Sequence, residues 1–464
     1  MKAIFLLLFF LCSLLAFSQQ IDITVRKLNT ERAVLSLLSG ETVTQFDTIT
    51  SSDNGRFLFS LKPVGTKVPT ALTAHTSGEK NHSGFYRLSF DNNRWIDFIN
   101  DNEDVAIITD AENILDSMKV LSSESNGIYY SFQKLNKQYK TKTELLQLVL
   151  ARYPKEDSYY KTTQATIGQL QKEYSEFINS AQRNPDSFTA RYIYSSQAPI
   201  VDFNVPPDKQ LAYLKSHALE SVNFNDEDLV NSDVFTNKAI EYLMYYRNPQ
   251  LPKEILEKEF NVAVDTILNK AKVNQVVYQH LTKYLIDGFK KYGFEKCINY
   301  ILDNYVIEDD LCLDEQSGSS IQRMIEQKKN LPIGSLVPNI TLPDSSGNIL
   351  SLLFLNAEKI LILFYSSSCP HCRTMIPMLH EYYSNKKQNG FEVLAISFDE
   401  IKNDWLNFIK TNNLRWVNVN DSKGWAGDAA SDYFIYATPT MFLVDKEKKI
   451  IAKPLTVEDL QKLF

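Results

Sequence analysis

Two cysteines, Cys369 and Cys372, follow an apolar run and open an amphipathic stretch. The run from Lys359 to Tyr365 predicts a buried strand, and the pattern after it predicts a helix from Cys369 to Ser384. A helix N-terminus carries partial positive charge and unpaired N–H groups, which stabilise the thiolate of a cysteine placed there. The two-residue spacing lets Cys372 reach the sulfur of Cys369. The stretch therefore predicts a redox-active dithiol in which Cys369 attacks and Cys372 resolves, with no cofactor beyond the disulfide itself.

Three other uses of such a motif fit the sequence less well. A zinc site commonly takes four ligands from two cysteine or histidine pairs, and the chain has no second C-x-x-C, so we expect no metal. Covalent haem attachment needs a histidine directly after the second cysteine, where this chain has Arg373. A peroxidase of the peroxiredoxin type needs a threonine and a proline in a fixed arrangement before its cysteine, which Ser366 to Ser368 do not supply.

The sequence resembles the exported thioredoxin-superfamily oxidoreductases of the TlpA and ResA type. The resemblance covers Leu331 to Phe464 and rests on the entry segment GSLVP, the strand LILFYSSS, the motif CPHC, the strand EVLAIS and the late segment ATPT. It implies a thioredoxin fold. It also implies that Thr438 and a cis Pro439 face the cysteines and pair with substrate, and that Pro370 contributes to substrate binding.

The dipeptide inside the motif, Pro370 and His371, makes it similar to the motif of DsbA-type oxidases. A histidine near the helix start can add positive charge and a donor at the Cys369 thiolate, which makes the disulfide more oxidising. Two positions depart from the thioredoxin pattern. Ser368 replaces the usual tryptophan, and Leu363 stands where many relatives carry a buried acid that takes the proton of the resolving thiol.

The N-terminus has the pattern of a secretory signal. Lys2 precedes a short apolar run, and small residues at positions 16 and 18 predict cleavage near Ser18. The run is shorter than the about 20 residues that a membrane helix needs. We therefore expect an exported protein, in the periplasm or associated with the cell envelope. In that oxidising compartment Cys297 and Cys312 could form a structural disulfide; the alternative is two separate buried thiols.

The rest of the chain predicts a multidomain protein. Alternating residues such as Phe57 and Phe59 indicate strands, and the spacing of Leu256, Phe260 and Ala263 indicates helices. The predicted organisation is a signal peptide at 1–18, an antiparallel β-sandwich-like domain at 19–110, an all-α region at 111–330, and an α/β thioredoxin domain at 331–464. Within the last domain we expect a hairpin at 340–353, strands at 359–365, 391–398, 440–444 and 449–452, and helices at 369–384, 405–412 and 457–464.

These observations favour an enzyme that exchanges thiols and disulfides of exported proteins. Its partners would be protein thiols or disulfides and a redox partner, for which a membrane-associated electron donor or acceptor is one candidate. A homo-oligomer is compatible with the sequence. Nucleic acid is not expected, because the net charge is −7 and no basic block occurs. The alternative is an envelope scaffold protein whose helical region binds a partner and whose thioredoxin module is regulatory.

Overall fold

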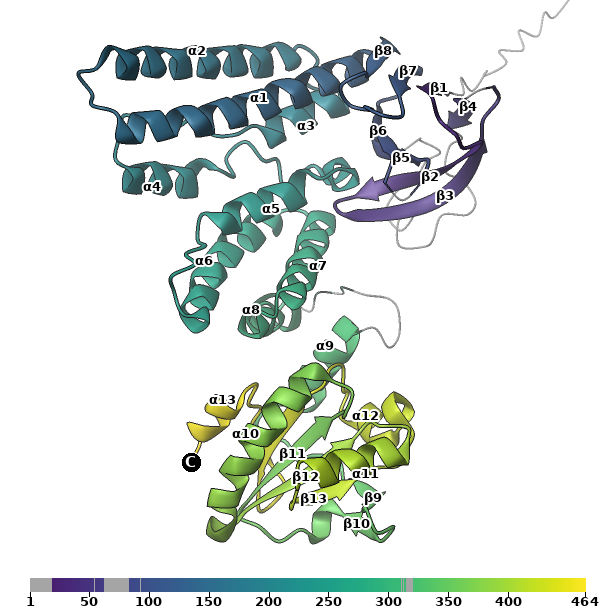
Figure 1. Cartoon of the computed structure of the whole chain (residues 1–464), viewed down its shortest axis with the longest axis vertical. Coiled ribbons are helices and arrows are strands. Elements are labelled where there is room, and N and C mark those ends of the chain that lie inside the picture. The colour runs from purple at the N-terminus through teal and green to yellow at the C-terminus, as the bar shows by residue number, and fades with distance from the viewer. Residues whose placement is uncertain are drawn as a thin grey trace, which may run out of the picture. The chain divides into compact units, whose positions relative to one another are not determined.

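The computed structural model describes residues 19–53, 55–61, 83–91, 93–309, 311, 313 and 320–464, drawn in colour in Figure 1. The predicted signal peptide lies outside these residues and stays a prediction. The chain divides into two compact units, one running to Leu285 and the other from Ile286 to Phe464. Each unit is described by itself.

The first unit begins with two four-stranded sheets, in the orders β4-β1-β7-β8 and β3-β2-β5-β6. The strands are β1 (Gln19–Arg26), β2 (Arg32–Ser39), β3 (Thr42–Thr50), β4 (Arg56–Leu61), β5 (Gly84–Ser89), β6 (Trp95–Asn100), β7 (Val105–Asp110) and β8 (Lys119–Ser122). The prediction of a purely antiparallel domain is wrong for one pair, because β1 runs parallel to β7. The strands also extend into the region expected to be all helical, because β8 pairs with β7.

The two sheets enclose a shared apolar core. In β1 every second residue is buried, which places Ile21, Ile23 and Val25 against Leu35 and Leu88 of the other sheet within one cluster. The alternation predicted for β4 is present, since Phe57 and Leu61 are buried while the residues between them are more exposed. The packing is that of a β-sandwich.

Helices follow the sandwich in the first unit. They are α1 (Glu124–Arg152), α2 (Ser158–Ala181), α3 (Phe188–Ser196), α4 (Pro207–His217), the 3-10 helix η1 (Glu227–Asn231), α5 (Val234–Met244), α6 (Lys253–Ala271) and α7 (Gln275–Lys291), whose last turns belong to the second unit. The predicted helical spacing is confirmed in α6, where Phe260, Ala263 and Ile267 are buried. A buried amide joins helix to sandwich, because the Asn126 side chain of α1 accepts from Ile99 N and donates to Ile99 O, both at 2.8 Å.

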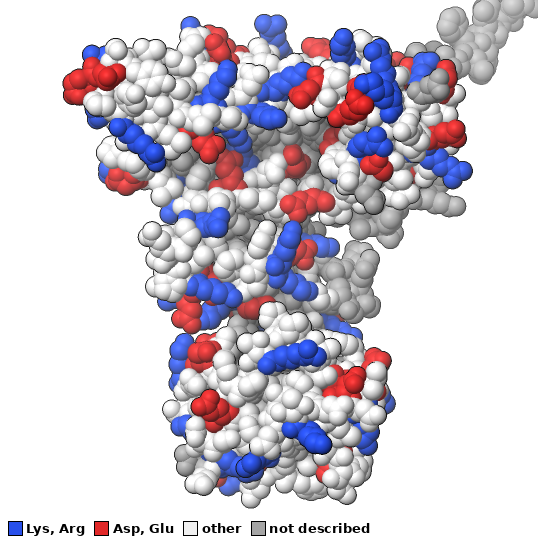
Figure 2. All heavy atoms as spheres, viewed as in Figure 1, with Lys and Arg blue, Asp and Glu red and all other residues white. Residues whose placement is uncertain are grey.

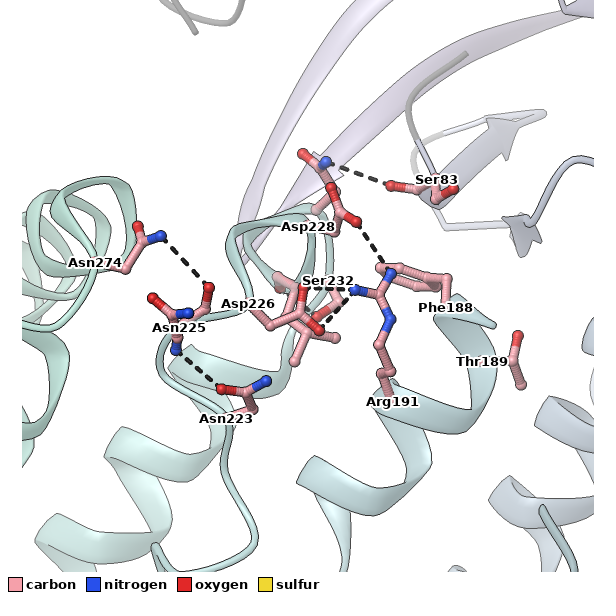
Figure 3. A network of polar contacts seen from close by, with 12 residues as sticks. Ser83, Phe188, Thr189, Arg191, Asn223, Asn225, Asp226, Asp228, Ser232 and Asn274 are labelled. Carbon is pink, nitrogen blue, oxygen red and sulfur yellow. Dashed lines mark hydrogen bonds and ion pairs between the residues drawn. The ribbon is translucent and has the colours of Figure 1, made fainter. Parts of the chain in front are cut away.

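A polar network holds α3 to η1 (Figure 3). The Arg191 guanidinium donates to both carboxylate oxygens of the nearly buried Asp226 at 2.8 and 2.9 Å and to Asp228 at 3.0 Å. Burial raises the pKa of Asp226, and the charge of Arg191 opposes that rise. An arginine shared by two aspartates at a helix junction is a structural clamp.

The second unit contains a five-stranded mixed sheet in the order β13-β12-β11-β14-β15, of which Figure 1 labels β11, β12 and β13. Its strands are β11 (Lys359–Tyr365), β12 (Phe391–Ser397), β13 (Val417–Val419), β14 (Thr440–Asp445) and β15 (Ile450–Ala452), and a separate hairpin is formed by β9 (Thr341–Pro343) and β10 (Ile349–Ser351). Strands β11, β12 and β13 are parallel, and β14 is antiparallel to both neighbours. The strands and the hairpin predicted for this region are confirmed, with ends that differ by one or two residues.

Helices and turns complete the second unit. They are α8 (Glu295–Ile301), the π-helical η2 (Leu302–Ile307), α9 (Ser320–Asn330), η3 (Leu352–Phe354), α10 (Pro370–Lys386), η4 (Lys387–Asn389), α11 (Lys402–Thr411), η5 (Gly424–Ala426), α12 (Asp428–Asp432) and α13 (Val457–Gln461). The sequence placed α9 with the helical region, but its Arg323 and Gln327 donate to main-chain carbonyls of residues 433 to 435. This helix therefore packs within the second unit.

Strand β11 is buried on both faces, and its side chains alternate between two cores. Leu361, Leu363 and Tyr365 join a core built with α10, α11 and α13, whereas Ile360 and Ile362 join one built with α12 and the segment that precedes β11. A strand in a parallel sheet covered on both faces is expected to be apolar throughout. Because β11 ends at Tyr365, the CPHC motif that follows lies at one edge of this sheet.

The surface carries both signs of charge. Figure 2 shows lysine and arginine interspersed with aspartate and glutamate over both units on the face drawn, without a large region of one sign. Among the described helices, none has a stretch long and apolar enough to cross a membrane.

Candidate functional site

The two cysteines of the CPHC motif lie at the start of α10. Cys369 is the residue that caps the helix, and its sulfur accepts a hydrogen bond from Cys372 N at 3.5 Å. Pro370 takes the first helical position, where its missing N–H leaves no bond unmade. The helix therefore begins one residue later than the sequence predicted, and the sulfur of Cys369 faces the free amides of its first turn.

The two thiols differ sharply in environment. Cys369 is half-buried, whereas Cys372 is fully buried against the core that includes Leu363 and Ile376. Burial tends to raise the pKa of Cys369, but hydrogen bonds with the Cys372 amide, with the side chains of Thr438 and Cys372 and with the His371 amide outweigh it and hold the pKa below its ordinary value. Burial raises the pKa of Cys372 to about 12, and the neighbouring Cys369 adds to the rise. The exposed thiol is therefore the more acidic one.

The loop before β14 faces the more exposed cysteine. The Thr438–Pro439 peptide bond is cis, the isomer that the resemblance implied. The Cys369 thiol donates to the Thr438 carbonyl, with sulfur and oxygen 3.3 Å apart. The structure thus brings Thr438 to Cys369, although the two residues are far apart in the sequence.

His371 and Pro370 lie on the exposed side of the first turn of α10. The backbone amide of His371 is one of the donors to the Cys369 sulfur. The part of His371 that contacts the thiol in this structure is therefore its main chain. An effect of the imidazole on the thiolate stays a prediction.

A buried carboxylate beside the motif was not anticipated from the sequence. Asp399 follows β12, is 7% exposed, and accepts hydrogen bonds from the hydroxyls of Ser366, Ser367 and Ser397 at 2.8 to 3.0 Å. The Ser367 backbone amide donates to both of its oxygens, at 3.0 and 3.2 Å. Leu363 lies in the apolar core with Cys372, and the buried carboxylate near the motif lies just after the neighbouring strand, β12. A serine-rich turn before the cysteines was the signal that an acceptor lay nearby.

The remaining predicted residues lie apart from this arrangement. Cys297 is buried on α8, and Cys312 lies outside the described residues, so a disulfide between them stays a prediction. Within the described part of the chain, no group of three or more histidine, cysteine, aspartate or glutamate residues is placed to hold a metal ion.

Comparison with known proteins adds to this geometry. Residues 333–453 match the model of the AhpC/TSA family. The chain is 29% identical over 132 residues to the thiol-disulfide oxidoreductase ResA of Bacillus cereus, a match that covers 28% of this chain and 75% of that protein. The C-terminal region is a thioredoxin-like oxidoreductase domain.

Two solved structures are similar to parts of the chain. The thioredoxin domain of a thiol-disulfide oxidoreductase from Bacteroides vulgatus is 34% identical and covers 29% of this chain and 95% of its own, with a TM-score of 0.28. A thioredoxin-like protein from Bacteroides caccae is 22% identical and covers 57% of this chain and 96% of its own, with a TM-score of 0.38. The CPHC motif lies within residues 333–453, the part of the chain that matches the family model.

Proposed function

We propose that this protein exchanges thiols and disulfides of exported proteins through the Cys369–Cys372 pair. The observation that carries the proposal is the asymmetry of the two thiols: a half-buried Cys369 at a helix N-terminus, stabilised as a thiolate, above a fully buried Cys372 of high pKa. Thiolates are the nucleophiles of disulfide exchange. The relatives named as thiol-disulfide oxidoreductases support the same chemistry.

In the reducing direction, the Cys369 thiolate attacks one sulfur of a substrate disulfide. A bond forms between Cys369 and that sulfur, and the other substrate sulfur leaves as a thiolate. Cys372 then gives its proton to the substrate thiolate released in the first step, or to water, and its own thiolate attacks the Cys369 sulfur. This attack releases the second substrate sulfur as a thiolate and forms the Cys369–Cys372 disulfide. Two electrons pass from the dithiol to the substrate, and in the oxidising direction the same steps run in reverse.

The loop at Thr438 and Pro439 is the proposed docking edge. The carbonyl of Thr438 lies 3.3 Å from the Cys369 sulfur, so an extended substrate segment bonded to this backbone would present its own sulfur to Cys369. Pro370 and His371 would border the segment on the other side of the thiol. We place this activity in the periplasm or cell envelope, where a membrane-associated electron donor or acceptor would regenerate the pair.

The test uses three alanine variants of the full chain and a substrate peptide containing a disulfide. Cys369→Ala should abolish exchange, and Cys372→Ala should accumulate a mixed disulfide between Cys369 and the peptide. Cys297→Ala, which changes a buried cysteine of α8, is the control and should exchange normally. Normal turnover by either motif variant would refute the proposal. If loss of Cys369 has no effect in cells while deletion of residues 111–330 does, the scaffold alternative is favoured.

A further inference from the structure

Asp399 presents a buried carboxylate whose partners among the described residues are hydroxyls and an amide, without a cation. Its four donors are the Ser366, Ser367 and Ser397 hydroxyls and the Ser367 backbone amide. The Asp399 carbonyl is also fixed, because Asn420 Nδ2 donates to it at 2.8 Å. An ionised carboxylate is buried at low cost only when its oxygens are well bonded. The arrangement is therefore rigid, and most of its bonds go to the turn before the cysteines.

That turn contacts both cysteines through its main chain. The Ser366 carbonyl accepts from Cys369 N at 3.2 Å, and the Ser366 backbone amide is placed to donate to the Cys372 sulfur. Arg373 of α10 donates to the Ser367 carbonyl at 2.6 Å, which fixes the turn from the other side. Ser366 thus links Asp399 to Cys372, because its hydroxyl bonds the Asp399 carboxylate and its backbone amide bonds the Cys372 sulfur.

We propose that Asp399 is a positioning residue for the resolving step, because it holds the turn at Ser366 so that the Ser366 amide points at the Cys372 sulfur. The inference rests on the proposed exchange activity. During resolution Cys372 gives up its proton and its thiolate attacks Cys369, so negative charge develops on a fully buried sulfur. Leu363 and Ile376 of the same core can offer that charge no hydrogen bond. The Ser366 amide, which supports that sulfur together with the Thr438 side chain, then matters more than it would in water.

The first attack depends less on this support. The Cys369 sulfur is bonded by the amides of Cys372 and His371, which belong to α10, and by the Thr438 side chain, and none of these lies in the turn that Asp399 holds. Loss of Asp399 should therefore slow the second step and largely spare the first. A residue needed only for folding would affect both steps together.

The experiment measures the two steps separately in the full chain with a disulfide-containing peptide. The first step is followed as mixed-disulfide formation in a Cys372→Ala background, and the second as decay of the mixed disulfide in the chain with both cysteines. Asp399→Ala should slow decay by about tenfold or more, the loss expected when a hydrogen bond to a charged group is lost, and should change formation by less than about threefold. Asp404→Ala, which removes an exposed acid of α11, is the matched control and should change neither rate.

Asp399→Asn keeps the shape of the side chain but turns an amide NH₂ toward donors. Asp399→Asn should slow decay of the mixed disulfide by about threefold or more. If the alanine variant does not fold, this variant tests the positioning role in its place. Decay within twofold of wild type in folded Asp399→Asn, or equal slowing of both steps, would overturn the positioning role. If the wild-type chain forms no mixed disulfide at all, the exchange activity itself fails.

Discussion

Alkylating reagents at neutral pH should modify Cys369 and leave Cys372 almost untouched. The pKa of Cys372 is raised to about 12 by burial, so only about one in 10⁵ of its thiols is ionised at neutral pH. The pKa of Cys369 lies below its ordinary value, so a far larger fraction of that thiol is ionised at neutral pH than of Cys372. Because the thiolate is the reactive form, the two rates should differ by about 10³-fold or more.

The assay treats the fully reduced protein with iodoacetamide and follows each cysteine by mass spectrometry. The rate at Cys369 should rise with pH and reach half of its maximum at a lower pH than the rate of an ordinary cysteine thiol does. Cys369→Ala should remove the fast reaction, and Cys372→Ala should retain it. The reasoning is refuted if Cys372 reacts within tenfold of Cys369 in the folded protein, or if the midpoint for Cys369 lies above the usual value.

Further predictions concern stability and redox potential. Gly55→Ala should lower the free energy of unfolding of the first unit by about 2 kcal/mol or more, because Gly55 has φ +85 and its Cβ would lie 2.3 Å from a carbonyl oxygen of β1. Gly293 has φ +71 and no atom within 4 Å of an added Cβ, so Gly293→Ala should lower the free energy of unfolding of the second unit by only about 1 kcal/mol. Equal losses of stability for the two glycine variants in thermal unfolding would contradict this. Trp405→Phe should lower the free energy of unfolding measured in urea by about 1–3 kcal/mol, because the Tyr365 hydroxyl loses the buried Trp405 Nε1 donor at 3.1 Å. An unchanged free energy of unfolding would show that this hydrogen bond contributes nothing. His371→Ala should make the pair more reducing by about 20 mV or less in glutathione equilibration, and a shift in the other direction would exclude a stabilising imidazole.

The second unit could be largely predicted from the sequence because its elements follow local rules. An unbroken apolar run such as β11 is required of a strand covered on both faces, and the residues from Pro370 onward carry a helix start signal. The position of the dithiol follows from these two elements alone. A short stretch of chain therefore contained most of the information for the site.

What could not be predicted depends on contacts between distant segments. Asp399 reaches Ser366 because β12 is the parallel neighbour of β11, and sheet order cannot be read from the pattern of either strand. The parallel pairing of β1 with β7 joins strands with five others between them in the chain, and only the finished sandwich makes it favourable. Helix α9 has an apolar side, but its partners at residues 433 to 435 lie a hundred residues further on.

The asymmetry of the two cysteines arises from the fold more than from the dipeptide between them. Cys372 is buried because its side of α10 faces the same core as Leu363, and this would hold for any residues at Pro370 and His371. Those two residues lie on the exposed side of α10, where they can alter only the stability of the Cys369 thiolate and the surface that contacts a substrate. Because stabilising that thiolate stabilises the dithiol, the exposed side is where the sequence can tune the redox potential. The buried side, with Cys372 and the turn held by Asp399, instead governs how fast a mixed disulfide is resolved.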